Sequence, residues 1–277
     1  MALKTILKEN KIHPNDTPNI TNEGRSRFYK LTIEYDGALY HGWQKQSHQS
    51  TVAETLEQVL SRLTQETIKI VGAGRTDAGV HAIGQVAHFQ TRRLISPLIL
   101  LRGLNGLLPE DISISSVEEV DAHFHARFGV TRKTYSYFIH NSKTRSAWKR
   151  NSAWHIRMPL DLQKMRQAAK MLMGVHDFTS FCAKETDAKD YVVTLAQLSI
   201  VRCKDQIKMT LIASRFLRYM VRNIVGLLVE VGQGKRAASD MASILEGKDR
   251  RLAGKTAPPH GLFLMKVEYG GTAACEA

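Results

Sequence analysis

An arginine and an aspartate stand two residues apart in the segment GAGRTDAGVHA, residues 72–82. Three glycines surround the pair, and glycine is typical of a chain that turns sharply or lets another group approach its backbone. The segment is therefore predicted to be a loop that presents Arg75 and Asp77. Both residue types commonly serve the fold alone, because an aspartate in a loop caps a turn and an arginine is usually a solvated surface residue. On this stretch alone the structural interpretation of the pair is favoured over a chemical one.

A second group that could take part in chemistry is Arg222, in the segment FLRYMVRNIVGLLVEV. The apolar residues recur at three- and four-residue spacing, which predicts one long helix over residues 216–231. Arg215, Arg218 and Arg222 would then form a basic stripe beside the apolar face. Such a stripe is usually solvated, but Arg222 has apolar neighbours on both sides and would need a carboxylate partner if buried. Asp77 is a candidate for that partner.

Histidines are the other chemically capable side chains near the glycine-rich loop. His81 and His88 flank it, and His123 and His125 form an H-x-H pair. Neither an HExxH motif nor a matched carboxylate pattern accompanies them, so no metal site is predicted. The sequence also lacks the GxSxG motif of serine hydrolases.

The N-terminus and the cysteines bear on the cellular compartment. The first residues lack the apolar run of a signal peptide, and no run approaches the roughly 18 to 20 apolar residues that span a bilayer. Cys182, Cys203 and Cys275 lie far apart and form no CxxC pair, which argues against a disulfide framework or a zinc ribbon. A cytoplasmic protein without membrane attachment is expected.

The net charge indicates a polyanionic partner. Lysine and arginine number 39 against 26 aspartates and glutamates, giving a formal charge of +13 and a pI near 9.7. Residues 141–170 contain eight of these cations and a single acidic residue, Asp161. Trp148 and Trp154 are interleaved with them, a pattern typical of surfaces that follow nucleic-acid phosphates and stack on bases.

The first half of the chain alternates strand and helix patterns. KLTIEYD begins a half-buried strand at Lys30, and residues 68–75 and 85–91 are predicted strands on either side of the glycine-rich loop. A capping box formed by Thr51 and Glu54 predicts one helix start. Ser96 followed by Pro97 predicts another. Two further strands are predicted at 112–120 and 133–141.

The second half repeats this alternation after about residue 151. A strand pattern at residues 154–160 precedes a helix on Leu162, Met165, Ala169 and Leu172. Predicted strands at 194–202 and 207–214 lead to the long helix, which is followed by a short helix around Met241 and a last strand at 261–269. The chain, with 43% hydrophobic residues, can bury a large core. We therefore predict an α+β protein with mainly antiparallel sheets, divided into a polar N-terminal extension (1–27), an N-terminal half (28–150) and a C-terminal half (151–277).

Taken together, motifs spread over nearly all of the chain after residue 27 resemble the A-type transfer-RNA pseudouridine synthases, whose hallmark is the loop GRTDAGVHA. The other matching segments are YDGALYHGWQKQ (35–46), LNGLLPEDI (104–112), FHARF (124–128), YSYFIHN (135–141), HDFTSF (176–181), FLRYMVRNIVG (216–226) and GLFL (261–264). By this resemblance Asp77 is the catalytic nucleophile, Arg75 helps to extrude the target base, and Tyr135 is the active-site tyrosine. Arg222 is the arginine partner of the aspartate, and Leu262 is a packing leucine.

The resemblance also implies an architecture and a substrate. It implies two ferredoxin-like halves that form one continuous, mainly antiparallel sheet, with helices on one side and a central active-site cleft. The expected enzyme is an isomerase that converts uridine to pseudouridine at positions 38, 39 and 40 in the anticodon arm of tRNA. It is expected to act as a homodimer, without cofactor or metal.

Two departures and two alternatives accompany this interpretation. Cys182 and Val193 stand where relatives often have arginines, so nearby RNA or structural contacts are expected to differ. The chain is alternatively a synthase for a different RNA site, because cleft chemistry does not specify the RNA. It is also alternatively a basic RNA-binding protein without catalysis on the same scaffold.

Overall fold

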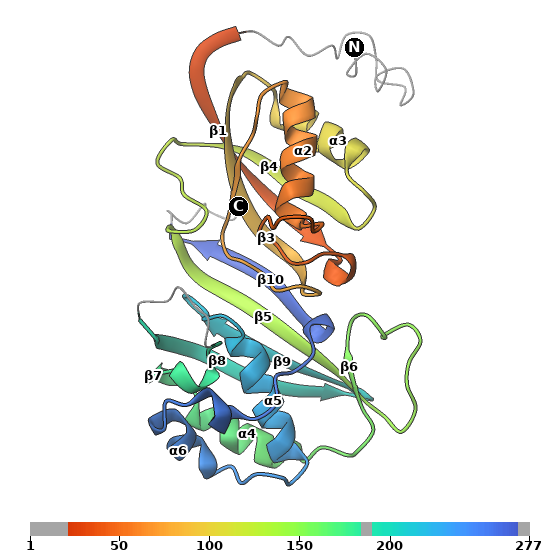
Figure 1. The fold of residues 1–277 in the computed structure, drawn as a ribbon, viewed down its shortest axis with the longest axis vertical. Coiled ribbons are helices and arrows are strands. Elements are labelled where there is room, and N and C mark those ends of the chain that lie inside the picture. The colour runs from red at the N-terminus through yellow and green to blue at the C-terminus, as the bar shows by residue number, and fades with distance from the viewer. Residues whose placement is uncertain (1–21, 184–189, 271–277) are drawn as a thin grey trace, which may run out of the picture. The chain divides into compact units, whose positions relative to one another are not determined.

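The protein forms two compact units in a computed structural model that describes residues 22–183 and 190–270. The first unit comprises Met1–Ala78 and Ala82–Gly129, and the second comprises Gly79–His81 and Val130–Ala277. The predicted division between residues 150 and 151 differs from this one. The reason is that β5 (Val130–Asn141) pairs with β9 (Gln206–Ala213) and β10 (Leu262–Tyr269), which belong to the second unit. The predicted α+β class with mainly antiparallel strands is confirmed (Figure 1).

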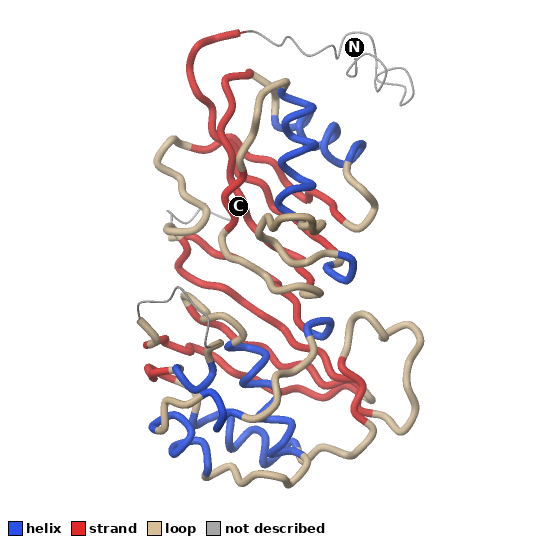
Figure 2. The backbone as a smooth tube through the Cα atoms, in the orientation of Figure 1, coloured by secondary structure: helices blue, strands red, loops and turns tan. Residues whose placement is uncertain are grey.

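The first unit has a sheet in the order β4–β1–β3, with short β2 paired to β3, and every pairing is antiparallel. The strands are β1 (Asn22–Tyr35), β2 (Ile70–Gly72), β3 (His81–Arg93) and β4 (Ile112–Val120). Helices α2 (Val52–Thr64) and α3 (Pro97–Leu107) cover one face of this sheet (Figure 2). Leu31, Ile33 and Phe89 are almost completely buried beneath them. A one-turn helix, η2 (Gly37–Leu39), follows β1.

Strand β1 begins at Asn22, earlier than the predicted start at Lys30 and inside the predicted extension. Arg27 and Phe28 pair with Thr91 and Gln90 of β3. A sheet ladder is made by backbone groups, so a polar stretch without alternating hydrophobicity can still extend a strand. The remainder of the predicted extension, residues 1–21, lies outside the described residues.

The two helix starts of the first unit were predicted with unequal success. The Ser96 side chain accepts a hydrogen bond from the amide of Ile99, which confirms the cap of α3. Helix α2 starts after Thr51 as predicted, but its capping box is wrong. The Thr51 hydroxyl makes no cap bond, and Glu54 pairs with Lys45 at 2.9 Å.

The second unit has a sheet in the order β10–β5–β9–β8–β7, which is antiparallel, and β6 pairs in parallel with β5. Its remaining strands are β6 (Trp154–Ile156), β7 (Gly174–Asp177), β8 (Val192–Cys203), β9 (Gln206–Ala213) and β10 (Leu262–Tyr269). The helices are α4 (Leu162–Met171), α5 (Met220–Gly232) and α6 (Asp240–Glu246). Three one-turn helices, η3 (Thr179–Phe181), η4 (Arg250–Ala253) and η5 (Pro259–Gly261), complete the unit. No helix within the described ranges has the length and apolarity to cross a membrane.

The predicted long helix at residues 216–231 is shorter than expected, because α5 begins only at Met220. Tyr219, the residue before it, has a φ of 65°, a left-handed conformation that interrupts any helix at that point. Arg215 and Arg218 therefore lie before the helix, and the predicted stripe of three arginines on one helix face is wrong. Arg215 instead pairs with Asp190 at 2.6 Å.

Candidate active site

Asp77 and Arg75 lie in the loop between β2 and β3 of the first unit. The backbone of the loop is held by residues of β3: the Ala73 amide donates to the Val86 carbonyl at 2.7 Å, and the Gln85 side chain donates to the Gly74 carbonyl at 2.9 Å. Arg75 is exposed and Asp77 is half-buried. An exposed guanidinium and a half-buried carboxylate, two residues apart, are thus presented from a fixed loop, as the glycine spacing predicted.

Thr76, the residue between them, connects the loop to two other segments of the first unit. Its side chain hydroxyl lies 2.8 Å from the Tyr35 hydroxyl, and its carbonyl accepts a hydrogen bond from the Trp43 amide at 3.1 Å. Tyr35 and Thr76 are both buried, and burial raises the pKa of the Tyr35 hydroxyl, so this group stays neutral. The carbonyl and the hydroxyl of one residue are thereby held by two different segments of the unit.

Gly42 allows the segment before α2 to approach the Asp77 loop. Its φ is 90°, and a Cβ atom there would lie 2.5 Å from the Thr76 carbonyl oxygen. Only glycine combines that conformation with that approach. The carbonyls of Gly42 and Trp43 also accept hydrogen bonds from the amides of Val52 and Ala53, at 3.2 and 3.1 Å. These bonds satisfy the first amides of α2, which explains why the predicted capping box is not needed.

Arg222 lies in the first turn of α5 in the second unit and is half-buried. Its Nε donates to the Ala257 carbonyl at 2.8 Å, and the Ala257 amide donates to the Arg222 carbonyl at 3.0 Å. The guanidinium lies 5.0 Å from the centre of the Tyr219 ring, a cation–π distance. Arg222 is therefore oriented by its own surroundings, and it does not lie on a solvated helix face.

Gly226, one turn after Arg222, serves the packing of this unit. A Cβ atom at this position would collide with the Lys255 carbonyl oxygen. The glycine thus lets residues 255–257 run directly along α5. The close approach at this glycine is made by the chain's own backbone.

Tyr135 and Leu262 lie on neighbouring strands of the second unit. Tyr135 is 7% exposed and its ring meets the edge of Phe216 at 5.0 Å. Leu262 is 5% exposed and pairs with Tyr137 across β5 and β10. Both side chains therefore sit in packed surroundings, where rotation is restricted.

Tyr137 and His260 were missed by sequence reasoning, although both lie beside predicted site residues. The Tyr137 hydroxyl donates to the Pro258 carbonyl at 2.8 Å. Burial raises the pKa of Tyr137, and the nearby Arg222 charge opposes that rise. Burial lowers the pKa of His260, and the charges of His81 and Arg222 lower it further. The signal for His260 was its place directly before the GLFL segment.

The H-x-H pair lies in a turn, and its orientation has a structural explanation. The Nδ1 atom of His125 accepts hydrogen bonds from the amides of Arg127 and Phe128, at 3.1 and 3.2 Å. His88 accepts one from Ala126 at 3.1 Å. Among the residues that the structure describes, no three histidine, cysteine or acidic side chains form a group able to hold a metal ion.

The two departures from the expected arginines are core positions. Cys182 and Val193 are each 2% exposed. Cys182 follows η3, and Val193 lies on β8. An apolar side chain suits such a position, because an arginine there would need a partner for its buried charge.

Comparison with known proteins first identifies the class to which this chain belongs, which is a class of RNA-modifying enzymes. The sequence model of the tRNA pseudouridine synthases matches residues 31–129 and 168–270. This chain belongs to the tRNA pseudouridine synthase family. It is 44% identical over 245 residues to tRNA pseudouridine synthase A of Geobacillus sp., covering 88% of this chain and 99% of that protein. It is 45% identical to the enzyme of the same name from Bacillus subtilis, covering 87% and 98%. Acetivibrio thermocellus has another relative with that name, 44% identical over 88% of this chain and 100% of its own length.

Proposed function

We propose that this protein converts uridine to pseudouridine at positions 38, 39 and 40 in the anticodon arm of tRNA, with Asp77 as the nucleophile. The observation that carries this proposal is the family match over both halves of the chain, which includes the loop that presents Asp77. The net charge of +13 supports a polyanionic substrate.

The reaction requires a group that holds one fragment while the other turns. The bond from the ribose to N1 of uracil breaks, and a new bond forms to C5 of the same base; C5 loses a proton and N1 gains one. Asp77 can attack either the uracil ring or the anomeric carbon, and both routes need an ionised carboxylate. The balance of atoms calls for no oxidant, reductant or metal, so no cofactor is proposed.

The other residues have distinct proposed roles. Arg222 keeps the Asp77 carboxylate ionised through a charge-assisted hydrogen bond. Tyr135 stacks on the base and takes part in removing the C5 proton. Arg75, which is exposed, occupies the space vacated by the flipped nucleotide or grips a phosphate. Leu262 packs beside the base.

The residues of the proposed site come from both units, since Asp77 and Arg75 belong to the first unit and Tyr135, Arg222 and Leu262 to the second. A homodimer that holds one tRNA across both subunits, and a cytoplasmic location, are part of the same proposal.

The decisive experiment is position-resolved detection of pseudouridine after incubation with unmodified tRNA. Product and substrate are isomers, so the assay uses selective carbodiimide labelling followed by primer extension. Pseudouridine at 38, 39 and 40 is expected, and none with Asp77→Asn. Product elsewhere would indicate a synthase for a different RNA site. Tight tRNA binding without any product would indicate a non-catalytic RNA-binding protein.

A further inference from the structure

A strongly basic loop joins β5 to β6 and is used by none of the proposed catalytic steps. We call residues 142–153 the basic loop. It contains Lys143, Arg145, Lys149 and Arg150 and no acidic residue. All of these except Lys149 are exposed. In the part of the chain that the structure describes, the ion pairs involve none of the four. Their charge is available to a partner.

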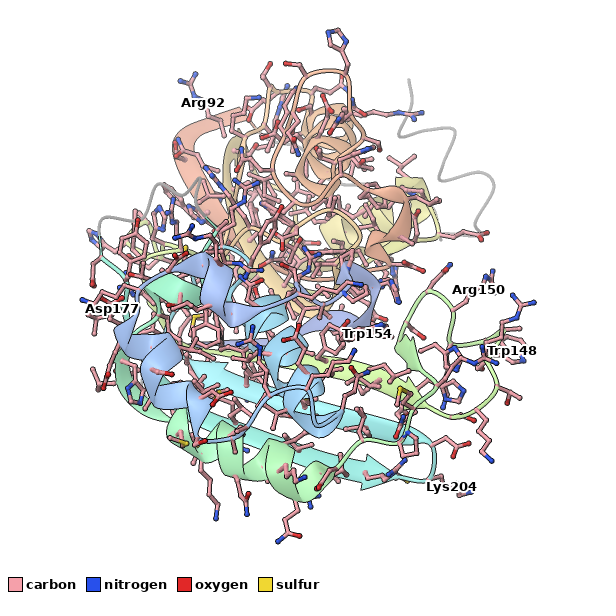
Figure 3. All side chains as sticks on the ribbon, turned by 60° about the horizontal axis from the view of Figure 1, so that its bottom comes forward. Arg92, Trp148, Arg150, Trp154, Asp177 and Lys204 are labelled. Carbon is pink, nitrogen blue, oxygen red and sulfur yellow. The ribbon has the colours of Figure 1, made fainter. Side chains whose placement is uncertain are left out.

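The same loop carries an indole ring that is almost fully exposed. Trp148 is 94% exposed, more than the other large hydrophobic side chains among the described residues. Figure 3 shows Trp148 and Arg150 together at the outer end of the loop, pointing away from the strands. An exposed indole ring beside several cations offers a partner a flat aromatic face on which a base can stack.

The basic loop is held in place at its base. Ring nitrogens of His140 and His155 lie 3.1 and 2.9 Å from carbonyl oxygens of the loop. The Asn141 side chain amide donates to the carbonyls of Ile156 and Met158, at 2.9 and 2.7 Å. The exposed ring and cations are therefore presented from an ordered support, which lowers the entropy lost when they bind a partner.

The loop also adjoins the candidate active site within the second unit. Trp154, directly after it, meets the Tyr137 ring edge to face at 6.4 Å. Tyr137 in turn donates to the carbonyl of Pro258, two residues before His260. The base of this loop is thus connected through packed residues to the segment that precedes Leu262.

We propose that the basic loop is a second tRNA-binding element, in which Lys143, Arg145 and Arg150 contact phosphates and Trp148 stacks on an unpaired base. This proposal rests on the proposed function. Cations alternating with an aromatic ring match a strand of phosphates and bases. A second copy of this chain is disfavoured as the occupant. In a twofold contact the same residues of the two copies meet. Two such loops, each with four cations and no acidic residue, would therefore repel each other.

The charge part of the proposal is tested by the salt dependence of tRNA binding. The loop variant is Lys143→Gln/Arg145→Gln/Arg150→Gln, and the matched control is Lys235→Gln/Lys248→Gln/Lys266→Gln, three exposed lysines of the second unit outside residues 141–170. We expect the log–log salt slope to fall by about 2 to 3 in the loop variant, at about 0.7 to 0.9 per lost phosphate contact, and to stay unchanged in the control. Equal slopes would overturn the proposal.

The stacking part is tested at Trp148. Trp148→Leu keeps apolar bulk and is expected to weaken binding by about fivefold or more, whereas Trp148→Phe keeps an aromatic face and restores most of the affinity. Equal affinities for the two variants would overturn the stacking role.

Light scattering tests the remaining alternative, in which the basic loop contacts a second copy of this chain. If Trp148→Leu turned a dimer into a monomer while the salt slope stayed unchanged, the loop would be a contact between copies and the proposal would be wrong. If the wild type itself neither bound nor modified tRNA, the proposed function would fail. If the wild type modified tRNA and the loop variants bound tRNA as the wild type does, only the role of the loop would be overturned.

Discussion

Two loops that each join a pair of strands, the Asp77 loop and the basic loop, are built in opposite ways. The Asp77 loop is held along its length: Ala73, Gly74 and Thr76 all bond to other segments of the first unit. The basic loop is held at its base, and its end exposes Trp148. Chemistry needs atoms held within a fraction of an ångström, whereas capture of a flexible polyanion needs accessible charge and surface.

This comparison predicts that changes in the Asp77 loop act on the chemical step and changes in the basic loop act on binding. The largest effect is expected for Asp77→Asn, which keeps the shape of the side chain and removes the nucleophile. Turnover should fall by at least about 10³-fold, while tRNA affinity stays within a few-fold of the wild type. Single-turnover measurement and filter binding check the two parts. Turnover near the wild-type rate would rule out Asp77 as the nucleophile.

The next largest effect is expected for Arg222→Met, which keeps bulk and removes the proposed partner of Asp77. A carboxylate without its cation in a desolvated pocket is protonated more easily, so the acidic limb of the rate profile should move to higher pH. The loss of rate should reach roughly 10²-fold or more. Arg222→Lys keeps the charge without the planar guanidinium and should be intermediate. Single-turnover rates against pH provide the test, and an unmoved limb in the Met variant would separate Arg222 from Asp77.

A smaller effect is expected for Gly42→Ala, which disturbs the support of Thr76 without touching Asp77 itself. The positive φ of Gly42 and the close Thr76 carbonyl would strain any side chain at this position. We therefore expect the free energy of unfolding to fall by about 1–3 kcal/mol, together with a lower kcat. Gly106→Ala is the control, because a Cβ there meets nothing within 4 Å and helix α3 should gain up to about 1 kcal/mol. Thermal unfolding and single-turnover rates measure both. A Gly42 variant as stable and active as the control would contradict the bracing role.

The smallest effect is expected for Tyr137→Phe, which removes the hydroxyl bonded to the Pro258 carbonyl. The control is Tyr29→Phe, since the Tyr29 hydroxyl donates to the Ile95 carbonyl at the same distance of 2.8 Å. Each substitution should cost about 0.5–1.5 kcal/mol of stability. Only the Tyr137 variant should also lower kcat, by a few-fold, because Pro258 lies directly before the segment that contains His260 and Leu262. Equal activity of the two variants would show that this bond has no part in positioning the site.

Elements with strong local signals were predictable from the sequence. Ser96 and Pro97 mark the start of α3 because the cap and the fixed proline φ act within one turn. The strands predicted at 112–120 and 133–141 carry a sufficient alternation of apolar residues, although the second begins three residues earlier, at Val130. The glycines around Arg75 and Asp77 identified the loop itself, because their spacing reflects a backbone requirement.

Other features depended on distant contacts that no local pattern encodes. Residues 22–29 form a strand because β3 pairs with them, and Thr51 loses its capping role because the carbonyls of Gly42 and Trp43 take it over. The positive φ of Tyr219 ends the apparent periodicity before α5, although no glycine marks the place. The joint position of Asp77 and Arg222 stays a prediction, because the two residues belong to different units.

Trp43 links the Asp77 loop to local opening of the first turn of α2. Its amide donates to Thr76, while its carbonyl accepts from Ala53 in the first turn of the helix. Local opening of that first turn therefore releases the support of the loop before the unit as a whole unfolds. Hydrogen exchange at the Trp43 and Ala53 amides should proceed through one shared opening event. Inactivation on mild heating would then follow this local event and precede the main melting transition.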